Sequence, residues 1–172
     1  DLAKKMSDDI EEMERMLNEY LEFSRHQKSE ETEMVDLNDL ITEIIKKYDS
    51  KQINVHFGEN LKINIRQNAI KRCLMNLIDN GLSYGKKVEI STKRTISDLI
   101  IFVDDNGSGI PEKEYHNVIK PFYRIDKSRG QNKSGVGLGL SITNDIIRAH
   151  GGNISLEKSP LKGLRVRISL PL

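Results

Sequence analysis

The sequence has 172 residues, which is room for one compact domain and a modest additional element. Because 37% of the residues are hydrophobic and 31% are charged, we expect a soluble chain that buries a core. The 27 Lys and Arg residues nearly balance the 26 Asp and Glu residues, so charge gives no reason to expect nucleic acid or an anionic membrane as a partner.

Cysteine content and hydropathy exclude two further classes. The single cysteine, Cys73, excludes an internal disulfide and fits a reducing compartment. The longest uninterrupted apolar run covers residues 99–103, whereas a helix needs roughly 20 apolar residues to cross a bilayer. The sequence also shows no signal peptide. These features predict neither a membrane span nor a disulfide scaffold within the chain.

Residues 1–30 are predicted to form one long helix of a helical bundle. The segment is rich in Glu, Asp and Lys and contains neither Gly nor Pro. Its apolar residues recur at alternating spacings of four and three, which is the pattern of a coiled coil or bundle. The stripe consists of Met6, Ile10, Met13, Leu17 and Tyr20, and Met16, Leu21 and Phe23 widen it beyond a two-stranded seam.

A helix this polar is not stable alone in water, so the stripe needs a partner. No second helix of matching length and pattern follows in the sequence. We therefore expect the helix to dimerise, to pair with a helix outside this chain, or both. The alternative is a surface helix that lies on the following domain.

After a charged joint at 28–33, the pattern predicts an α+β domain. Helices are expected at 37–49, 67–84, 111–118 and 138–150, and strands at 53–57, 61–65, 87–94, 98–104, 153–157 and 164–170. The inward face of the 67–84 helix would carry Ile70, Cys73, Leu74, Leu77 and Ile78. Because helices and strands do not alternate strictly, the predicted fold is a two-layer α/β sandwich, with a mixed, mostly antiparallel sheet covered by helices, preceded by one long bundle helix.

Two clusters in the first half of this domain could carry chemistry. Asn76 and Asn80 are four residues apart, so both amides project from one helix face, where their oxygens suit Mg²⁺ beside phosphates. Two solvated polar residues would show the same spacing. Residues 104–110 follow an apolar strand, and their glycines allow close approach of a ligand, while a carboxylate there can accept a hydrogen bond from an amine such as that of adenine. A simple turn is the alternative.

Two further clusters lie in the second half. Residues 121–124, Pro-Phe-Tyr-Arg, precede a basic loop with Lys127 and Arg129 that could close over phosphates, although an exposed loop would look similar. Residues 135–140 alternate glycine with apolar residues as a helix begins, and free N–H groups at a helix N-terminus bind anions. The spacing is neither a dinucleotide-binding fingerprint nor a P-loop, and a flexible loop is the weaker alternative.

In order and spacing, the four clusters resemble the N, G1, F and G2 boxes of sensor histidine kinase catalytic domains, whose fold is shared with gyrase, Hsp90 and MutL ATPases. The resemblance covers residues 34–172, which we take as the catalytic ATP-binding domain. Residues 1–30 resemble the second helix of the dimerisation and histidine phosphotransfer domain that precedes this fold in the family. The osmosensor EnvZ and its relatives look most similar.

The resemblance implies a site for ATP and Mg²⁺. Asn76 and Asn80 would hold Mg²⁺ and the phosphates, and with Arg124 and Lys127 of a mobile lid they would form the catalytic group. The other nucleotide contacts implied are Tyr84 against the base, Asp105 at the adenine amine, Gly107, Gly109 and Ile110 around the base, and Gly135, Gly137, Leu138, Gly139 and Leu140 around the phosphates.

The same resemblance implies transfer of the γ-phosphoryl group of ATP to a histidine, for relay to a response regulator. The partners would be ATP, a second copy joined through helix 1–30 with a missing partner helix, and the regulator. Since the chain opens at Asp1 already in a helical pattern, we expect a fragment. It would be a cytoplasmic domain of a parent protein in the bacterial inner membrane.

The sequence departs from the family pattern at two places beside the second asparagine. Many members have Ala and Lys where this chain has Gly81 and Ser83. Gly81 should cost the helix about 1 kcal/mol relative to Ala, and Ser83 lacks an ammonium group that helps to neutralise phosphate. Both changes concern nucleotide affinity rather than the fold.

No histidine matches the family's phosphoacceptor motif of His, an acid and a Pro five residues after the His. His116 has Pro121 at the right distance, but Asn117 replaces the acid. His26 and His150 are expected at helix ends, and His150 precedes a Gly-Gly stop signal. We therefore predict that the chain binds ATP without phosphorylating itself.

Two alternatives to a kinase remain at this point. An ATPase of the gyrase or Hsp90 type would carry a water-activating Glu where this chain has Asn76, and an amide cannot act as that base. A non-catalytic interaction module would keep the fold and lose the nucleotide. Ser83 favours that module, whereas Asn76, Asp105 and the glycines of 135–139 oppose it.

Overall fold

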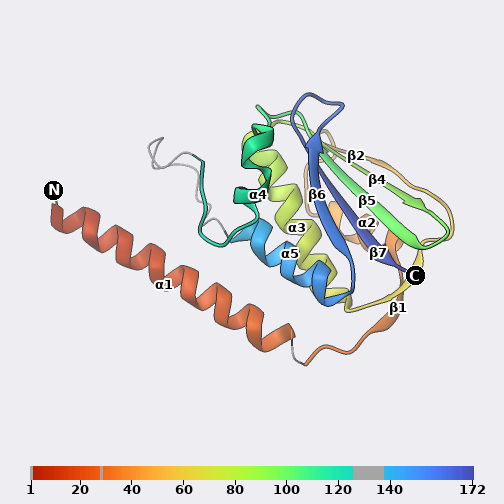
Figure 1. The fold of residues 1–172 in the computed structure, drawn as a ribbon, viewed down its shortest axis with the longest axis horizontal. Helices are drawn as coiled ribbons and strands as arrows, with labels where there is room; N and C mark the ends of the chain where they lie inside the picture. Colours follow the sequence, from red (N-terminus) through yellow and green to blue (C-terminus); the bar gives the residue numbers. More distant parts are fainter. Residues whose placement is uncertain (1, 28, 126–137) are drawn as a thin grey trace.

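The computed structural model describes residues 2–27, 29–125 and 138–172, and the ribbon is drawn in Figure 1. The helical elements are α1 (Leu2–Gln27), α2 (Leu37–Ile45), α3 (Gln67–Tyr84), the short 3-10 helix η1 (Glu112–Glu114), α4 (Tyr115–Val118) and α5 (Gly139–Ala149). The strands are β1 (Glu33–Asp36), β2 (Ile53–His56), β3 (Lys62–Ile65), β4 (Val88–Arg94), β5 (Asp98–Asp105), β6 (Asn153–Lys158) and β7 (Leu164–Pro171).

A five-stranded sheet of order β2-β4-β5-β7-β6 forms one layer of the domain. β2 runs parallel to β4, and the other neighbouring strands of this sheet are antiparallel. β1 and β3 form a separate antiparallel pair. The predicted α+β sandwich with a mixed, mostly antiparallel sheet is therefore confirmed.

Alternation along the strands decides which face of the sheet is buried. In β4, Val88 and Ile90 are buried, whereas Glu89 and Ser91 between them are partly exposed. The buried face packs against α3 and α5, and Figure 1 shows these two helices lying together on one side of the sheet. This two-layer arrangement follows from strands with one apolar face and helices with one apolar stripe.

The apolar stripe of α3 is buried along its length. α3 begins and ends where the sequence predicts, and it contacts α2, α5 and β5. Each of the five residues predicted to face inward is at most 2% exposed: Ile70, Cys73, Leu74, Leu77 and Ile78. Burial also raises the pKa of the Cys73 thiol to about 12, so this cysteine is an inert core residue.

Two local expectations differ from the structure. α2 ends at Ile45 rather than near residue 49, because the N–H groups of Lys47 and Tyr48 turn back to carbonyls three residues earlier. β1 was not predicted, and it lies between the charged joint and α2. It has four residues, of which Val35 is buried, so its pattern is too short to stand out, and its last residue, Asp36, caps α2 by accepting the N–H of Asn38 at 2.9 Å.

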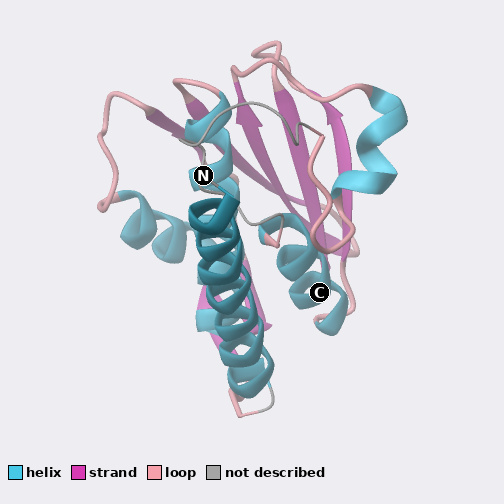
Figure 2. Ribbon diagram, turned by 90° about the vertical axis from the view of Figure 1, so that its left-hand side faces the viewer, coloured by secondary structure: helices cyan, strands magenta, loops and turns pink. Residues whose placement is uncertain are grey.

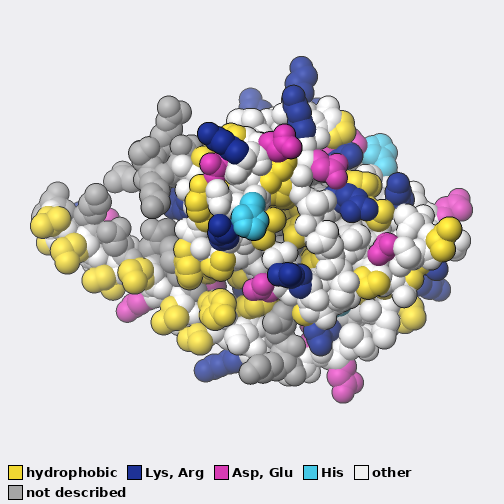
Figure 3. Space-filling model, in the orientation of Figure 1, with side chains coloured by type: hydrophobic (Ala, Val, Ile, Leu, Met, Phe, Trp, Pro, Cys, Tyr) yellow, Lys and Arg dark blue, Asp and Glu magenta, His cyan; other side chains and the backbone are white. Residues whose placement is uncertain are grey.

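α1 projects away from the sheet, as the two views in Figures 1 and 2 show. The stripe from Met6 to Tyr20 is exposed, and Figure 3 shows hydrophobic side chains along this arm. Near the other end of α1, Phe23 is only 6% exposed, and the guanidinium carbon of Arg72 on α3 lies 5.5 Å from its ring centre. Among the described residues, no helix has the length and apolar character that a bilayer span requires.

Candidate functional site

Residues of three predicted clusters meet at the last turns of α3. Asn76 and Asn80 are both half-buried on this helix. A Cβ built on Gly139, the first residue of α5, would lie 3.6 Å from Nδ2 of Asn80. The side chain of Asn80 therefore lies directly against the N-terminus of α5, although 59 residues separate the two positions in sequence.

The end of β5 approaches the same part of α3. A Cβ on Gly81 would lie 3.3 Å from Cβ of Asp105 and 2.6 Å from Cγ2 of Val88. One on Gly107 would lie 2.8 Å from the carbonyl oxygen of Tyr84. Helix and sheet thus touch with almost no side chain between them, which gives a packing reason for Gly81, where many family members carry Ala.

Asp105 is a buried carboxylate with one oxygen already bonded. Its Oδ1 accepts the N–H of Gly107 at 2.8 Å and the N–H of Leu164 at 3.2 Å, and the side chain is 8% exposed. Burial raises the pKa of Asp105, and the two backbone donors oppose that rise. With Oδ1 held in place, Oδ2 is the oxygen suited to accept a hydrogen bond from a ligand.

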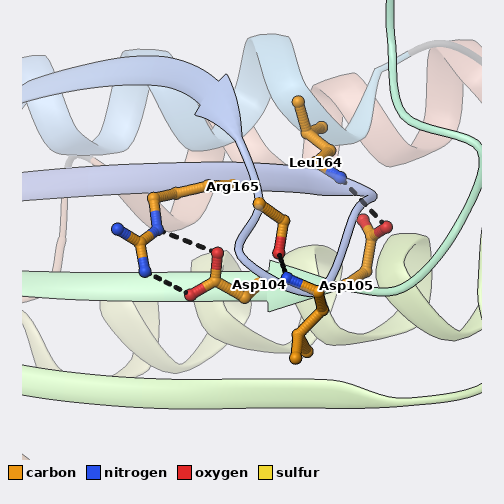
Figure 4. A network of polar contacts seen from close by, with 6 residues as sticks. Asp104, Asp105, Leu164 and Arg165 are labelled. Atoms are coloured by element: carbon orange, nitrogen blue, oxygen red, sulfur yellow. Dashed lines mark hydrogen bonds and ion pairs between the residues drawn. The ribbon is translucent and has the colours of Figure 1, made fainter.

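The neighbouring Asp104 points the other way, as Figure 4 shows. Its two oxygens accept from Nε and Nη2 of Arg165 at 2.8 and 2.9 Å, a bidentate pair. The guanidinium of Arg165 also lies 4.5 Å from the ring centre of Phe102. Asp104 is thereby neutralised on the outer face. Among the described residues, the end of β5 therefore offers one buried carboxylate without an ion pair, that of Asp105.

The other predicted nucleotide-binding residues that the structure describes differ in how exposed they are. Gly109 has a φ of +72°, a backbone conformation that favours glycine, and it borders the turn before β7. Ile110 and Leu140 are partly buried against the core, and Leu138 is 2% exposed, so it would offer a ligand only its backbone. Tyr84 is 60% exposed at the end of α3.

Tyr123, in the aromatic segment that precedes the predicted lid, is held by a hydrogen bond to Glu114. The hydroxyl of Tyr123 donates to Oε2 of Glu114 at 2.5 Å, which lowers the pKa of Glu114 and raises that of Tyr123. Phe122 has a φ of +63° and is 58% exposed, and Arg124 is half-buried. The predicted lid cation Lys127 and the glycines at 135 and 137 lie outside the described residues.

The turn between β6 and β7 packs onto Asp105, and no motif in the sequence predicted this contact. A Cβ on Gly163 would lie 2.1 Å from Oδ1 and 2.4 Å from the carbonyl oxygen of Asp105, so only glycine fits there. Gly163 also donates its N–H to that carbonyl at 3.2 Å, and Leu164 supplies the second donor to Oδ1. The available signal was a glycine at the end of a short turn between two predicted strands.

A separate apolar groove of about 810 Å³ lies between α1 and the domain. Tyr20 and Leu17 line one side, and Phe122 and Leu138 line the other. Asn76, Asn80 and Asp105 are not among its lining residues, whereas Leu138, which was predicted near the phosphates, is one of them.

Comparison with known proteins identifies the family of the chain. A family model described as histidine kinase-, DNA gyrase B-, and HSP90-like ATPase matches residues 65–172. The sensor histidine kinase GtrS of Pseudomonas aeruginosa is 34% identical over 172 residues, covering 99% of this chain and 36% of GtrS. The chain therefore spans about a third of the length of such curated relatives.

Two solved structures give the same assignment. The catalytic domain of histidine kinase ThkA is 28% identical with a TM-score of 0.69, covering 82% of this chain and 95% of that domain. The histidine kinase domain of the E. coli osmosensor EnvZ is 29% identical with a TM-score of 0.64, covering 83% of this chain and 89% of that one. The chain belongs to the histidine kinase-, DNA gyrase B- and HSP90-like ATPase family and carries a catalytic domain of its sensor histidine kinase branch.

Proposed function

We propose that this chain is the nucleotide-binding part of a sensor kinase and binds ATP together with Mg²⁺. The observation that carries the proposal is the contact of Asn80 with Gly139 at the start of α5. This contact supports the proposal because the side-chain amide of Asn80, whose oxygen suits Mg²⁺, lies beside the N-terminus of α5, whose backbone N–H groups suit phosphate. At the other end of the site, the carboxylate of Asp105 is oriented for an amine of the base.

The proposed reaction is transfer of the γ-phosphoryl group to a histidine outside this chain. Phosphoryl transfer needs positioning and charge neutralisation more than covalent chemistry from the protein. Asn76 and Asn80 would hold Mg²⁺, which neutralises phosphate charge when bound, and Arg124 and Lys127 would add positive charge at the terminal phosphate. The amide of Asn76 cannot activate water as a base, so the chemistry favours transfer over hydrolysis.

We divide the chain into a helical part, residues 1–30, and a catalytic part, residues 34–172. The exposed stripe of α1 supports pairing with a second copy and with a helix of the parent protein outside this chain. ThkA, which shares the fold, has been solved in complex with the response regulator TrrA. A response regulator is therefore the proposed downstream partner. We also propose that the parent protein is anchored in the bacterial inner membrane, with this part in the cytoplasm.

Calorimetric titration with ADP and ATP, with and without Mg²⁺, tests nucleotide binding directly. Binding should strengthen when Mg²⁺ is present. Asp105→Asn should weaken ADP binding by about 1.5 to 3 kcal/mol, because the amine of the base loses a charged acceptor. Asp98→Asn, a matched change at the opposite end of β5, should leave the affinity unaltered. No heat of binding from the unmutated chain would favour a non-catalytic module.

The same Asp105 variant should be more stable than the unmutated chain near neutral pH. Burial raises the pKa of Asp105 in the folded state above its unfolded value of 3.8. The protonated carboxyl group therefore stabilises the fold fully below pH 3.8, and this stabilisation is lost as the pH rises through the folded-state pKa. The amide of Asn stays neutral, and its oxygen still accepts both N–H groups. Urea unfolding between about pH 4 and pH 7 should show that the difference in the free energy of unfolding between the variant and the unmutated chain grows as the pH rises. A difference that does not change with pH would contradict a raised pKa of Asp105.

Incubation with γ-labelled ATP tests the location of the phosphoacceptor. The chain alone should remain unlabelled, and a protein that supplies the acceptor helix should become labelled when this chain is added. Acid-labile label mapped to His26 or His116 of this chain would contradict the proposal.

A further inference from the structure

The N-terminus of α3 is capped by Glu30, which lies in the linker (residues 29–32) between α1 and β1, and not by a residue of its own first turn. Oε1 of Glu30 accepts the N–H of Asn68 at 2.7 Å, and Oε2 accepts the N–H of Ala69 at 3.2 Å. Arg66, at the N-cap position, has no acceptor in its side chain and cannot make these bonds. A carboxylate at this end of the helix also complements the positive end of the helix dipole.

Arg66 and His150 extend the contact from α3 to α5. Nε of Arg66 donates to the carbonyl oxygen of Glu30 at 3.2 Å, and the backbone N–H of Arg66 donates to Nε2 of His150 at 3.1 Å. Nδ1 of His150 lies 2.7 Å from the carbonyl oxygen of Ile146, so this nitrogen carries the hydrogen. The linker is thereby bonded to the start of α3, which is bonded in turn to the end of α5.

α1 itself meets α3 at a second place. Phe23 is buried beside the guanidinium of Arg72, which lies one helical turn before Asn76. Thus α1 and its linker hold the same helix that carries the two asparagines of the nucleotide site. Residues 6–20 of α1 keep their stripe exposed, so its direction depends on contacts near its C-terminal end.

We propose that Glu30 is a positioning residue, which sets the direction in which α1 leaves the catalytic domain by holding the linker on α3. The inference rests on the proposed function, because phosphoryl transfer requires the helical part to bring an acceptor histidine to the terminal phosphate. Asn76 and Asn80 lie roughly two to three helical turns beyond Asn68. Loss of the Glu30 carboxylate therefore weakens the hold of the linker on α3, so that α1 can vary its direction about the remaining contact at Phe23, and it leaves the nucleotide site assembled.

The experiment compares Glu30→Ala with Glu31→Ala, a neighbouring exposed glutamate of the same charge. Nitroxide labels on Asp8→Cys and Lys93→Cys, both at exposed positions, report the distance between α1 and the sheet. Cys73 is fully buried and stays unlabelled. Labelled protein is diluted with unlabelled protein so that pairs between copies do not contribute, and ADP affinity is measured on each variant.

Glu30→Ala should broaden the distance distribution and speed amide exchange at Asn68 and Ala69 about fivefold, with ADP affinity unchanged. Glu31→Ala should match the unmutated chain, and Glu30→Gln, which keeps an acceptor oxygen, should lie between. A narrow distribution in Glu30→Ala, or a broad one in the unmutated chain, would overturn the inference. Absence of ADP binding in the unmutated chain would instead remove the proposed function, and the distance measurement would still decide the role of Glu30.

Discussion

α1 and α3 are both amphipathic helices, but the apolar stripe of α3 is buried and that of α1 is exposed. On α3, Leu74 is 1% exposed and packs in a core shared with the sheet and α5. On α1, Leu17 is 59% exposed, although it lies on an equally regular stripe. A stripe by itself therefore predicts a helix that needs a partner, and the structure shows whether this chain supplies the partner.

The comparison is tested most directly by removing equivalent side chains. Leu74→Ala should lower the free energy of unfolding by about 2 to 5 kcal/mol, because a fully buried leucine leaves a cavity. Urea unfolding followed by circular dichroism measures the loss. A loss as small as that of an exposed leucine would mean that α3 is not packed as the structure has it.

A second test asks whether the tight interior extends to the turn over Asp105. Gly163→Ala should cost about 1 to 3 kcal/mol and weaken ADP binding, because a methyl group cannot fit against the carboxylate. Lys162→Gly is the matched control in the same turn, since Lys162 has a φ of +78° that glycine adopts without strain. Thermal unfolding measures the stability of both variants, and calorimetry measures their ADP affinity. Equal stability and equal affinity of the two variants would show that Gly163 is not tightly packed against Asp105.

A third test probes the close approach of α3 to the sheet. Alanine at position 81 gains about 1 kcal/mol of helix propensity but meets Cγ2 of Val88 at 2.6 Å. We expect Gly81→Ala to be destabilising by about 1 kcal/mol in the unmutated chain and stabilising in a Val88→Ala background, where the space is open. A double-mutant cycle measures this reversal of sign, and additive effects would show that the two positions do not touch.

The smallest effect on stability is expected on α1. Leu17→Ala should change the free energy of unfolding by less than about 0.5 kcal/mol at low protein concentration, because the side chain is largely exposed. It should instead weaken self-association, measured by analytical ultracentrifugation. A strictly monomeric unmutated chain would contradict the dimerisation proposal and leave the nucleotide site untouched.

The sequence predicted the elements with long regular patterns best. α3 was placed to the residue because 18 residues with an uninterrupted apolar stripe leave little ambiguity. β1 was missed because a four-residue strand with one buried side chain carries almost no periodic signal. The end of α2 was misplaced because a turn with bonds to the third residue back continues the helical spacing for a few residues.

The site was predicted in a different way. The spacing of Asn76 and Asn80 suggested a shared face, but their link to Asp105 and Gly139 came from resemblance to a family. No local pattern could reveal that Leu164, 59 residues after Asp105, donates to its carboxylate. Contacts of this kind depend on strand order, and the placement of β7 beside β5 is not encoded in either segment alone.

The position of β7 has a consequence for synthesis on the ribosome. β5 lies between β4 and β7, so the strand that ends in Asp105 leaves the exit tunnel with one of its two neighbours still unmade. Until the residues after the 163 turn emerge, Asp105 lacks the donor from Leu164, and the apolar edge of β5 has no covering strand. Nascent chains of this protein should therefore pass through a stage in which an open edge invites chaperones or misassembly, and pausing of translation before β7 would lengthen it.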